Sequence, residues 1–556
     1  MRRRAWVVAL VAAAALAGYG LGANEDAREI TSDMIEAAED LIDLHFTRAE
    51  RDSMRDDLAD YREAYAKMRS VPLDNAVAPA LVFDPRPRGF ALAQEQGPLA
   101  LNAPRESSVP EDLEALAFYS VRDLAELVRT RQVTSAALTR MYIDRLKAHG
   151  PALECVITLT EDLALAQARR ADEEIAAGKY RGPLHGIPYG AKDLLAVPGY
   201  PTTWGAVPYK DQVIDDTAAV VRRLEEAGAV LVAKLTLGAL AWGDVWYGGT
   251  TRNPWNPEQG SSGSSAGSAS ATAAGLVAFA IGTETWGSIV SPSTRCGTTG
   301  LRPTFGRVSR AGAMALSWSM DKVGPICRAV EDCALVLNAI KGPDGDDETV
   351  IDLPFSWNAD RDPQDLRVGY LRSAFEDRPE EEDRQELYEL NQQSLEAVRS
   401  LGIDLIPIEL PEVPVSAIGF ILVVEAAAAF DDLTRDDVDD TLVRQDDRAW
   451  PNRLRTHRAV PAVEYLQANR VRRIAMQEMA RTLAGIDVYL SPTFGDNLRL
   501  TNLTGHPAVV VPNGFRANGT PTSITFCGNL FCDSEAMLLA RAYQESTGFH
   551  LQHPRL

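Results

Sequence analysis

Residues 260–288 read GSSGSSAGSASATAAGLVAFAIGTETWGS, a glycine-, serine- and alanine-rich run that leads into an apolar stretch and a second serine at a tight glycine turn. Three interpretations compete: a flexible linker, a phosphate-binding loop and a catalytic centre. A Gly/Ser linker does not continue into an apolar run such as AGLVAFAIG, which must be buried. A phosphate loop would carry a GxxxxGK[ST] pattern, which the sequence lacks. The catalytic interpretation remains, and it requires a nucleophile, a base and an oxyanion site.

The serine at the end of this stretch is the candidate nucleophile. Ser288 follows Thr285-Trp286-Gly287, a turn that can direct successive main-chain N–H groups at an oxyanion beside the hydroxyl. A histidine base is hard to place, because only His185 and His506 of the seven histidines lie in motif-like contexts. A serine–lysine arrangement therefore stays open.

Two lysines are candidate bases. This chain uses arginine for most of its cations, and lysine occurs at only eight positions. Lys192 in GAKD and Lys234 in VLVAKL lie among apolar and glycine residues, where loss of solvent lowers the pKa of an ammonium group. The alternative is a structural lysine paired with Asp193 or Asp244.

Composition excludes several classes of partner. The chain has 556 residues, of which 46% are hydrophobic and 24% charged, so most of it is expected to be globular. The net charge of −22 argues against nucleic acid or an anionic membrane surface as a main partner. The six cysteines show no CxxC spacing and the histidines are not paired, so we predict no metal site and free, buried thiols.

The N-terminus has the form of an export signal. MRRRAWVVALVAAAALAGYGLGANED places three arginines before an alanine-rich apolar run and small residues that end at Ala23. We predict a signal peptide over residues 1–23, a periplasmic or secreted mature chain, and no membrane attachment after cleavage. An uncleaved membrane anchor is the alternative, and Tyr19, Gly20 and Gly22 favour cleavage.

Two regions follow the signal. Residues 24–110 are predicted to form a helical hairpin and an extended, proline-marked strap. Within the hairpin, Thr47 and Glu50 form a capping-box signature that predicts the start of a second helix. Residues 111–556 alternate amphipathic helices with short apolar strands, which predicts one α/β domain.

Four blocks of sequence carry a family resemblance. They are GPLHGIPYGAKD (182–193), SGSSAGSASATAAG (262–275), GTETWGSIVSPSTRCGTTGLRPTFGRVS (282–309) and NLTGHPAVVVPNGF (502–515). In this order they resemble the blocks of the amidase signature family, over about residues 112–550. The resemblance implies an α/β/α sandwich around a large twisted mixed sheet, with the hairpin as an N-terminal helical extension. It also implies an amide hydrolase without a cofactor.

The resemblance also implies a Ser–cis-Ser–Lys triad. Motif by motif, Ser288 is the nucleophile, Ser264 the relay serine and Lys192 the base. Main-chain N–H groups of Thr285, Trp286, Gly287 and Ser288 are the expected oxyanion donors, Ser265 a supporting hydrogen-bond partner, and Lys234 structural support.

Two departures from the family pattern bear on the substrate. Trp286 stands where the family usually has glycine, and a bulky side chain there is expected to reshape the acyl pocket. Val290 stands where arginine is common, which weakens the case for a polar, glutamine-like substrate. We expect an apolar or aromatic acyl amide. Trp242, Trp246 and Tyr247 are candidates for the pocket entrance, although core packing explains them equally well.

The N-terminal extension is similar to the small C subunit of the tRNA-dependent amidotransferases, which wraps around the amidase-family member of those complexes. Two functions therefore compete: an exported, self-sufficient amidase acting on a small-molecule amide, and an amidotransferase A-like subunit that supplies ammonia to a partner. The export signal and the acidic charge favour the first. A non-catalytic binding module is disfavoured because Lys192, Ser264 and Ser288 are all present. The sequence leaves the oligomeric state open.

Overall fold

A computed structural model describes residues 29–92, 97, 99–106 and 108–556 of the chain. The signal predicted over residues 1–23 lies outside the described residues. The chain divides between Asp74 and Asn75 into two compact units. The extended strap, which the sequence analysis grouped with the hairpin, thus belongs for the most part to the larger unit.

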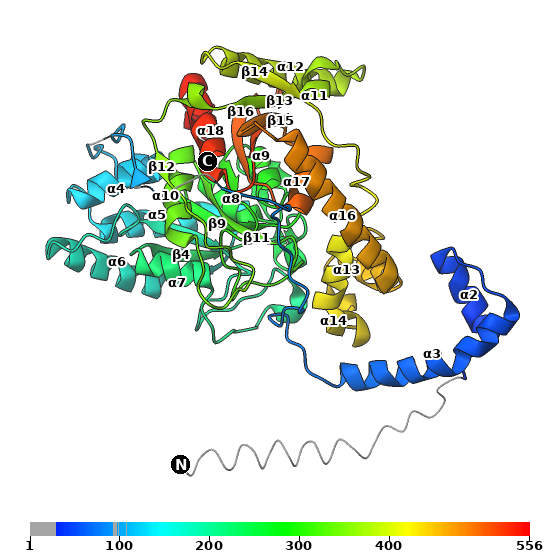
Figure 1. Ribbon diagram of the computed structural model, residues 1–556. Helices are drawn as coiled ribbons and strands as arrows, with labels where there is room; N and C mark the ends of the chain where they lie inside the picture. Colours follow the sequence, from blue (N-terminus) through cyan, green and yellow to red (C-terminus); the bar gives the residue numbers. More distant parts are fainter. Residues whose placement is uncertain (1–28, 93–96, 98, 107) are drawn as a thin grey trace, which may run out of the picture. The chain divides into compact units, whose positions relative to one another are not determined.

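The smaller unit contains the two predicted helices, α2 (Ser32–Ile42) and α3 (Arg48–Arg69) (Figure 1). The predicted capping box is confirmed: the Thr47 side chain accepts the Glu50 N–H, and the Glu50 carboxylate accepts the Thr47 N–H. Arg51 of α3 donates to both carboxylate oxygens of Glu39 in α2, at 2.9 and 2.8 Å. This paired charge joins the two helices into a hairpin.

The larger unit is built on an 11-stranded mixed sheet. In spatial order the strands are β14 (Leu405–Ile408), β13 (Val368–Leu371), β15 (Val488–Pro492), β17 (Pro521–Gly528), β16 (Ala508–Phe515), β10 (Thr299–Arg302), β11 (Lys322–Cys327), β9 (Phe279–Glu284), β3 (Pro188–Lys192), β4 (Val230–Leu235) and β2 (Val156–Leu159). The pairs β3–β4, β3–β9, β13–β14 and β13–β15 are parallel, and the other neighbours are antiparallel.

Helices enclose this sheet (Figure 1). They are α4 (Val121–Arg129), α5 (Ser135–Leu153), α6 (Glu161–Ala176), α7 (Ala219–Glu226), α8 (Ala266–Ala273), α9 (Val290–Cys296), α10 (Val330–Ile340), α11 (Arg372–Glu376), α12 (Glu382–Arg399), α13 (Phe420–Ala429), α14 (Asp431–Arg435), α15 (Trp450–His457), α16 (Ala462–Thr482), α17 (Asp496–Thr504) and α18 (Asp533–Thr547). Every residue of β3 and β4 is buried, as expected of parallel strands covered on both faces. The predicted α/β fold is confirmed.

Three short strand pairs lie outside the main sheet. They are β1 (Leu99–Ala100) with β12 (Trp357–Asn358), β5 (Val245–Trp246) with β6 (Gly249–Thr250), and β7 (Arg252–Asn253) with β8 (Asn256–Gly260). The first pair is parallel and joins the strap to the segment after α10.

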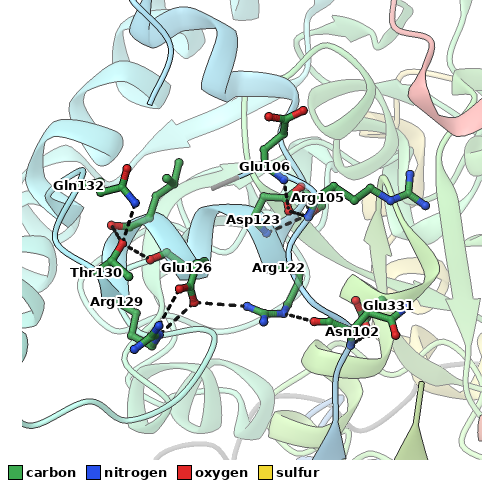
Figure 2. Close-up of polar contacts among 12 residues, drawn as sticks. Asn102, Arg105, Glu106, Arg122, Asp123, Glu126, Arg129, Thr130, Gln132 and Glu331 are labelled. Carbon is green, nitrogen blue, oxygen red and sulfur yellow. Dashed lines mark hydrogen bonds and ion pairs between the residues drawn. The ribbon is translucent and has the colours of Figure 1, made fainter. Parts of the chain in front are cut away.

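The end of the strap is fixed to α4 and α10 by hydrogen bonds, which Figure 2 shows. The main-chain N–H groups of Arg105 and Glu106 donate to Asp123 at 2.8 and 3.2 Å. The main chain of Asn102 donates to Glu331 at 3.0 Å and accepts from the Arg122 guanidinium at 3.0 Å. Acidic side chains thus satisfy main-chain donors that an extended segment leaves unpaired.

Two further observations concern the described residues. All six cysteines are free thiols, and five of them are buried. No helix in the described part of the chain has both the length and the apolar character needed to cross a bilayer.

Candidate active site

Lys192 is the last residue of β3 and lies beside β9, the parallel neighbour of that strand. Its Nζ is 2.8 Å from Ser264 Oγ, 3.1 Å from Ser265 Oγ and 2.8 Å from Thr283 Oγ1. The side chain is fully buried, and no carboxylate of the described residues lies within 4 Å of Nζ. Burial lowers the pKa of Lys192 to about 7, against the opposing fields of Asp321 and Glu284.

Ser264 lies between β8 and α8, and the Gly263–Ser264 peptide bond is cis. Two glycines near the serine pair, Gly263 and Gly267, leave no room for a side chain. A Cβ on Gly263 would lie 1.8 Å from the Gly243 carbonyl oxygen, and one on Gly267 would lie 2.4 Å from the Cys155 oxygen. The glycines of the Gly/Ser/Ala run therefore permit close packing rather than flexibility.

Ser288 lies in the turn between β9 and α9. The Ser265 N–H donates to the Ser288 carbonyl at 3.1 Å, which holds the two serine segments together. Gly287 has a φ of 111°, a conformation that strongly favours glycine.

Glu284, at the end of β9, holds the residues that directly follow the turn Thr285–Ser288. Its carboxylate accepts the N–H groups of Ile289 and Val290 at 2.9 and 3.0 Å, and pairs with Arg302 at 2.7 Å. Burial alone would raise the pKa of Glu284, but Arg302 and these hydrogen bonds hold it below its usual range. The carboxylate is thus ionised and anchors the start of α9, where the helix dipole favours a negative charge.

A cavity of about 660 Å³ opens above Ser288. Thr285, Trp286, Gly287 and Ser288 line it, and its apolar wall comes from four aromatic side chains and several aliphatic ones. The aromatic residues are Trp242, Trp286, Trp450 and Phe494. Of the three residues considered for the entrance, only Trp242 lines the cavity, whereas Trp246 and Tyr247 pack against each other with ring centroids 4.9 Å apart.

One cation of this cavity lacks an acidic partner. The Arg453 guanidinium stacks over Trp242 at 4.3 Å and donates to the Arg448 carbonyl at 3.0 Å. Within the described part of the chain, no carboxylate comes within 4 Å of it, whereas Arg499 in the same lining pairs with Asp496. Burial, Arg444 and Arg448 lower the pKa of Arg453. The cavity therefore presents a guanidinium that has no acidic partner among the described residues, stacked on an aromatic wall.

The other candidate groups lie elsewhere. Lys234 pairs with Asp193 at 2.8 Å, both fully buried, as the structural alternative proposed. His185 lies beside Glu174 and His506 beside Thr504, and neither lines the cavity. No group of three or more potential metal ligands occurs among the residues that the structure describes.

Two polar residues of the site, Thr283 and Asp321, were not predicted from the sequence. Thr283 accepts from Lys192, and the only available signal was its place two residues before Thr285 on a strand adjacent to β3. Asp321 accepts the Thr285 hydroxyl at 2.5 Å. The residues of that pair are 36 positions apart, and no local pattern links them.

The sheet carries a buried lysine in contact with one serine segment, and the second serine segment lines the cavity. This arrangement agrees with the amidase resemblance of the sequence. The amidase family profile matches residues 137–499, and the chain belongs to this family. It is an amidase signature enzyme with a hydrolytic activity on amide C–N bonds.

Individual relatives agree with this assignment. The glutamyl-tRNA(Gln) amidotransferase A subunit of Methylococcus capsulatus is 32% identical over 482 residues, which cover 78% of this chain and 98% of that protein. The corresponding protein of Azoarcus sp. is 32% identical over 487 residues, 78% of this chain and 99% of that one. Among solved structures, the peptide amidase of Stenotrophomonas maltophilia is 30% identical with a TM-score of 0.70, covering 80% of this chain and 99% of that chain.

Proposed function

We propose that this protein is an exported amidase in which Ser288 is the nucleophile, Ser264 the relay and Lys192 the base. The observation that carries the proposal is the 2.8 Å contact between Lys192 Nζ and Ser264 Oγ in a buried setting that lowers the pKa of Lys192 to about 7. A lysine with that pKa is partly neutral at physiological pH and can accept a proton.

The reaction proceeds in two halves. The Ser288 hydroxyl attacks the amide carbonyl, while its proton passes to Ser264 and the Ser264 proton passes to Lys192. Main-chain N–H groups of Thr285, Trp286, Gly287 and Ser288 stabilise the oxyanion. The lysine proton returns through Ser264 to the leaving nitrogen, which departs as ammonia or an amine. Water then attacks the acyl-enzyme by the same proton path and releases the acid.

The cavity favours an apolar or aromatic acyl group. The aromatic side chains beside Ser288 offer flat apolar surface, and Trp286 occupies space close to the nucleophile. The Arg453 guanidinium, which pairs with no carboxylate of the described residues, adds a site for an anionic group on the substrate. The likeness to a peptide amidase supports an amide of this kind, such as one carried by a peptide.

The alternative is an amidotransferase A-like subunit, which the 32% identity to a glutamyl-tRNA(Gln) amidotransferase component favours. Such a protein would need a partner that accepts its ammonia. Against it stand the predicted export signal and the net charge of −22, which separate the chain from tRNA. We also propose a periplasmic or secreted location, which N-terminal sequencing of the mature protein tests: a chain that begins at Asn24 supports it, and retention of Met1 contradicts it.

The deciding experiment is turnover of an amide panel by the purified chain from residue 24. The panel comprises fatty, aryl, peptide C-terminal and glutamine amides. Ser288→Ala should reduce kcat by about 10⁴-fold or more, because the nucleophile is lost. Ser291→Ala is the matched control, since this serine lines the same cavity three residues further on. Turnover of glutamine alone would favour the amidotransferase-like function, and equal activity of the two variants would overturn the assignment of Ser288.

A further inference from the structure

The strap begins with a side chain whose amide is fully engaged in hydrogen bonds. Asn75 Oδ1 accepts the Ala315 N–H at 2.7 Å, and Nδ2 donates to the carbonyls of Ala315 at 2.9 Å and Ala429 at 3.3 Å. Ala315 belongs to the loop 313–321, and Ala429 is the last residue of α13. One residue of the N-terminal extension therefore fastens a loop to a helix more than 100 positions away.

Both fastened segments form walls of the substrate cavity. Leu316 of the loop lines the cavity, as do Leu422 and Val423 of α13. Glu425 of α13 also accepts the hydroxyls of Ser317 and Ser319, each at 2.7 Å. The loop 313–321 and α13 thus form one wall of the cavity, and the hydrogen bonds of Asn75 join the two segments at Ala315 and Ala429.

Asp321 connects this wall to the turn that bears the nucleophile. Its Oδ2 accepts the N–H groups of Leu316 and Ser317 at 2.8 and 2.9 Å, and its Oδ1 accepts the Thr285 hydroxyl at 2.5 Å. Thr285 is the first residue of the turn Thr285–Ser288. A chain of hydrogen bonds therefore runs from the strap through the loop 313–321 to the turn Thr285–Ser288, called the oxyanion turn below.

We propose that Asn75 and Asp321 are positioning residues that hold the main-chain N–H groups of the turn Thr285–Ser288, so that the strap is part of the catalytic apparatus. This inference rests on the proposed function of Ser288 and its turn. Oxyanion stabilisation depends on donors that are already in place before the reaction, and a displacement of about 1 Å costs roughly 100-fold in rate. Asn75 touches no substrate and acts only through the wall it fastens.

The test compares Asn75→Ala with Asn102→Ala in the full mature chain. Asn102 is in the same strap, and the strap contacts described for it use its main chain, which alanine keeps. Two rates are measured: turnover of the best amide, and phosphonylation of Ser288 by a fluorophosphonate, which needs no known substrate. We expect Asn75→Ala to lower kcat and the labelling rate by about 10-fold or more with little change in KM, and Asn102→Ala to change them less than about 2-fold.

Two further variants keep the outcome decisive. Asn75→Asp retains the acceptor for the Ala315 N–H and loses the two donated bonds, so it serves if the alanine variant fails to fold. Asp321→Asn should slow labelling and also move the acid limb of the pH profile to lower pH, because Asp321 and Glu284 are the two charges that raise the pKa of Lys192. The shift of this limb reports the loss of the Asp321 charge, and the labelling rate on the pH plateau reports the position of the turn.

The outcomes separate the two proposals. Absence of labelling at Ser288 in the unsubstituted protein overturns the proposed function and this inference with it. Labelling of the unsubstituted protein, with Asn75→Ala, Asn75→Asp and Asn102→Ala all reacting at the same rate, leaves Ser288 as nucleophile and overturns only the role of the strap.

Discussion

At the scale of single residues, the chemistry of the site depends on which buried lysine has a carboxylate beside it. Lys192 and Lys234 are both fully buried, yet within the described residues only Lys234 has a carboxylate partner, Asp193. Burial lowers the pKa of both lysines, but at Lys234 the contacting Asp193 carboxylate opposes this effect, whereas at Lys192 only the more distant Asp321 and Glu284 do. The difference between the two lysines therefore lies in Asp193, which points to Lys234 although it follows Lys192 in sequence.

The titration of Lys192 gives a prediction at this scale. The base acts in its neutral form, so kcat/KM should rise with pH through an apparent pKa of about 7 and then reach a plateau. Lys192→Met should reduce kcat/KM at all pH values and remove this acid limb, because the remaining groups cannot accept the proton from Ser264. Rate measurements from pH 5 to pH 9 check this, with Lys234→Met as the comparison. An unchanged acid limb in Lys192→Met would assign the titration to another group.

The sequence predicts most of this site because its chemistry is local. Ser264, Ser265, Ser288 and the glycines are set by short motifs, and the structure brings Lys192 to Ser264 and Ser265 as the resemblance implied. Asp321 was not predictable, because its bond to Thr285 depends on how the loop 313–321 packs after folding.

At the scale of elements, the strand β9 and the helix α9 form a unit around Glu284. The carboxylate binds the first N–H groups of the helix and the Arg302 side chain of β10. The same carboxylate accepts from Asn502 of α17 at 2.9 Å. Four elements, β9, α9, β10 and α17, are thus joined next to the turn Thr285–Ser288, which keeps the turn rigid while it faces the cavity.

The Trp286 side chain is predicted to set the selectivity for the size of the acyl group. Its ring lines the cavity and lies against Gly419 at the start of α13, where an added Cβ would come within 3.4 Å of the indole. Trp286→Gly removes this ring but keeps the main-chain N–H, so it should widen the cavity next to Ser288 while the oxyanion donors remain. We expect kcat/KM to fall about 10-fold or more for small aryl amides, and to change less for bulky ones. The ratio of kcat/KM for the small aryl amide to kcat/KM for the bulky amide measures the selectivity.

Another aromatic residue of the same cavity lining provides a control for this experiment. Phe494→Ala also removes an aromatic ring from the cavity lining, but it is distant in sequence from the oxyanion turn. If both variants changed the selectivity ratio equally, Trp286 would contribute only apolar surface, and its position beside the nucleophile would have no special effect.

At the scale of the whole molecule, the N-terminal region contains two parts with different roles. The helical hairpin is a compact unit of its own that ends at Asp74. The strap is instead integrated into the larger unit: Phe83 packs edge-on against Phe305 with centroids 5.0 Å apart, and Phe90 lies 5.8 Å from Phe531. The sequence predicted both the hairpin and the strap, but it did not predict that the strap belongs to the larger unit, because that placement depends on long-range aromatic contacts.

The last prediction follows from this division. A chain that begins at residue 71 lacks the hairpin and retains every contact of the strap, so its main unfolding transition should stay within about 2 °C of that of the chain from residue 24. A chain that begins at residue 106 also loses the strand pair β1–β12 and the aromatic contacts of the strap, and burial of each such side chain is worth about 1.5–3 kcal/mol. We expect its Tm to fall by about 5 °C or more. Scanning calorimetry of the three chains checks this, and equal Tm values would show that the strap lies on the surface of the catalytic unit without stabilising it.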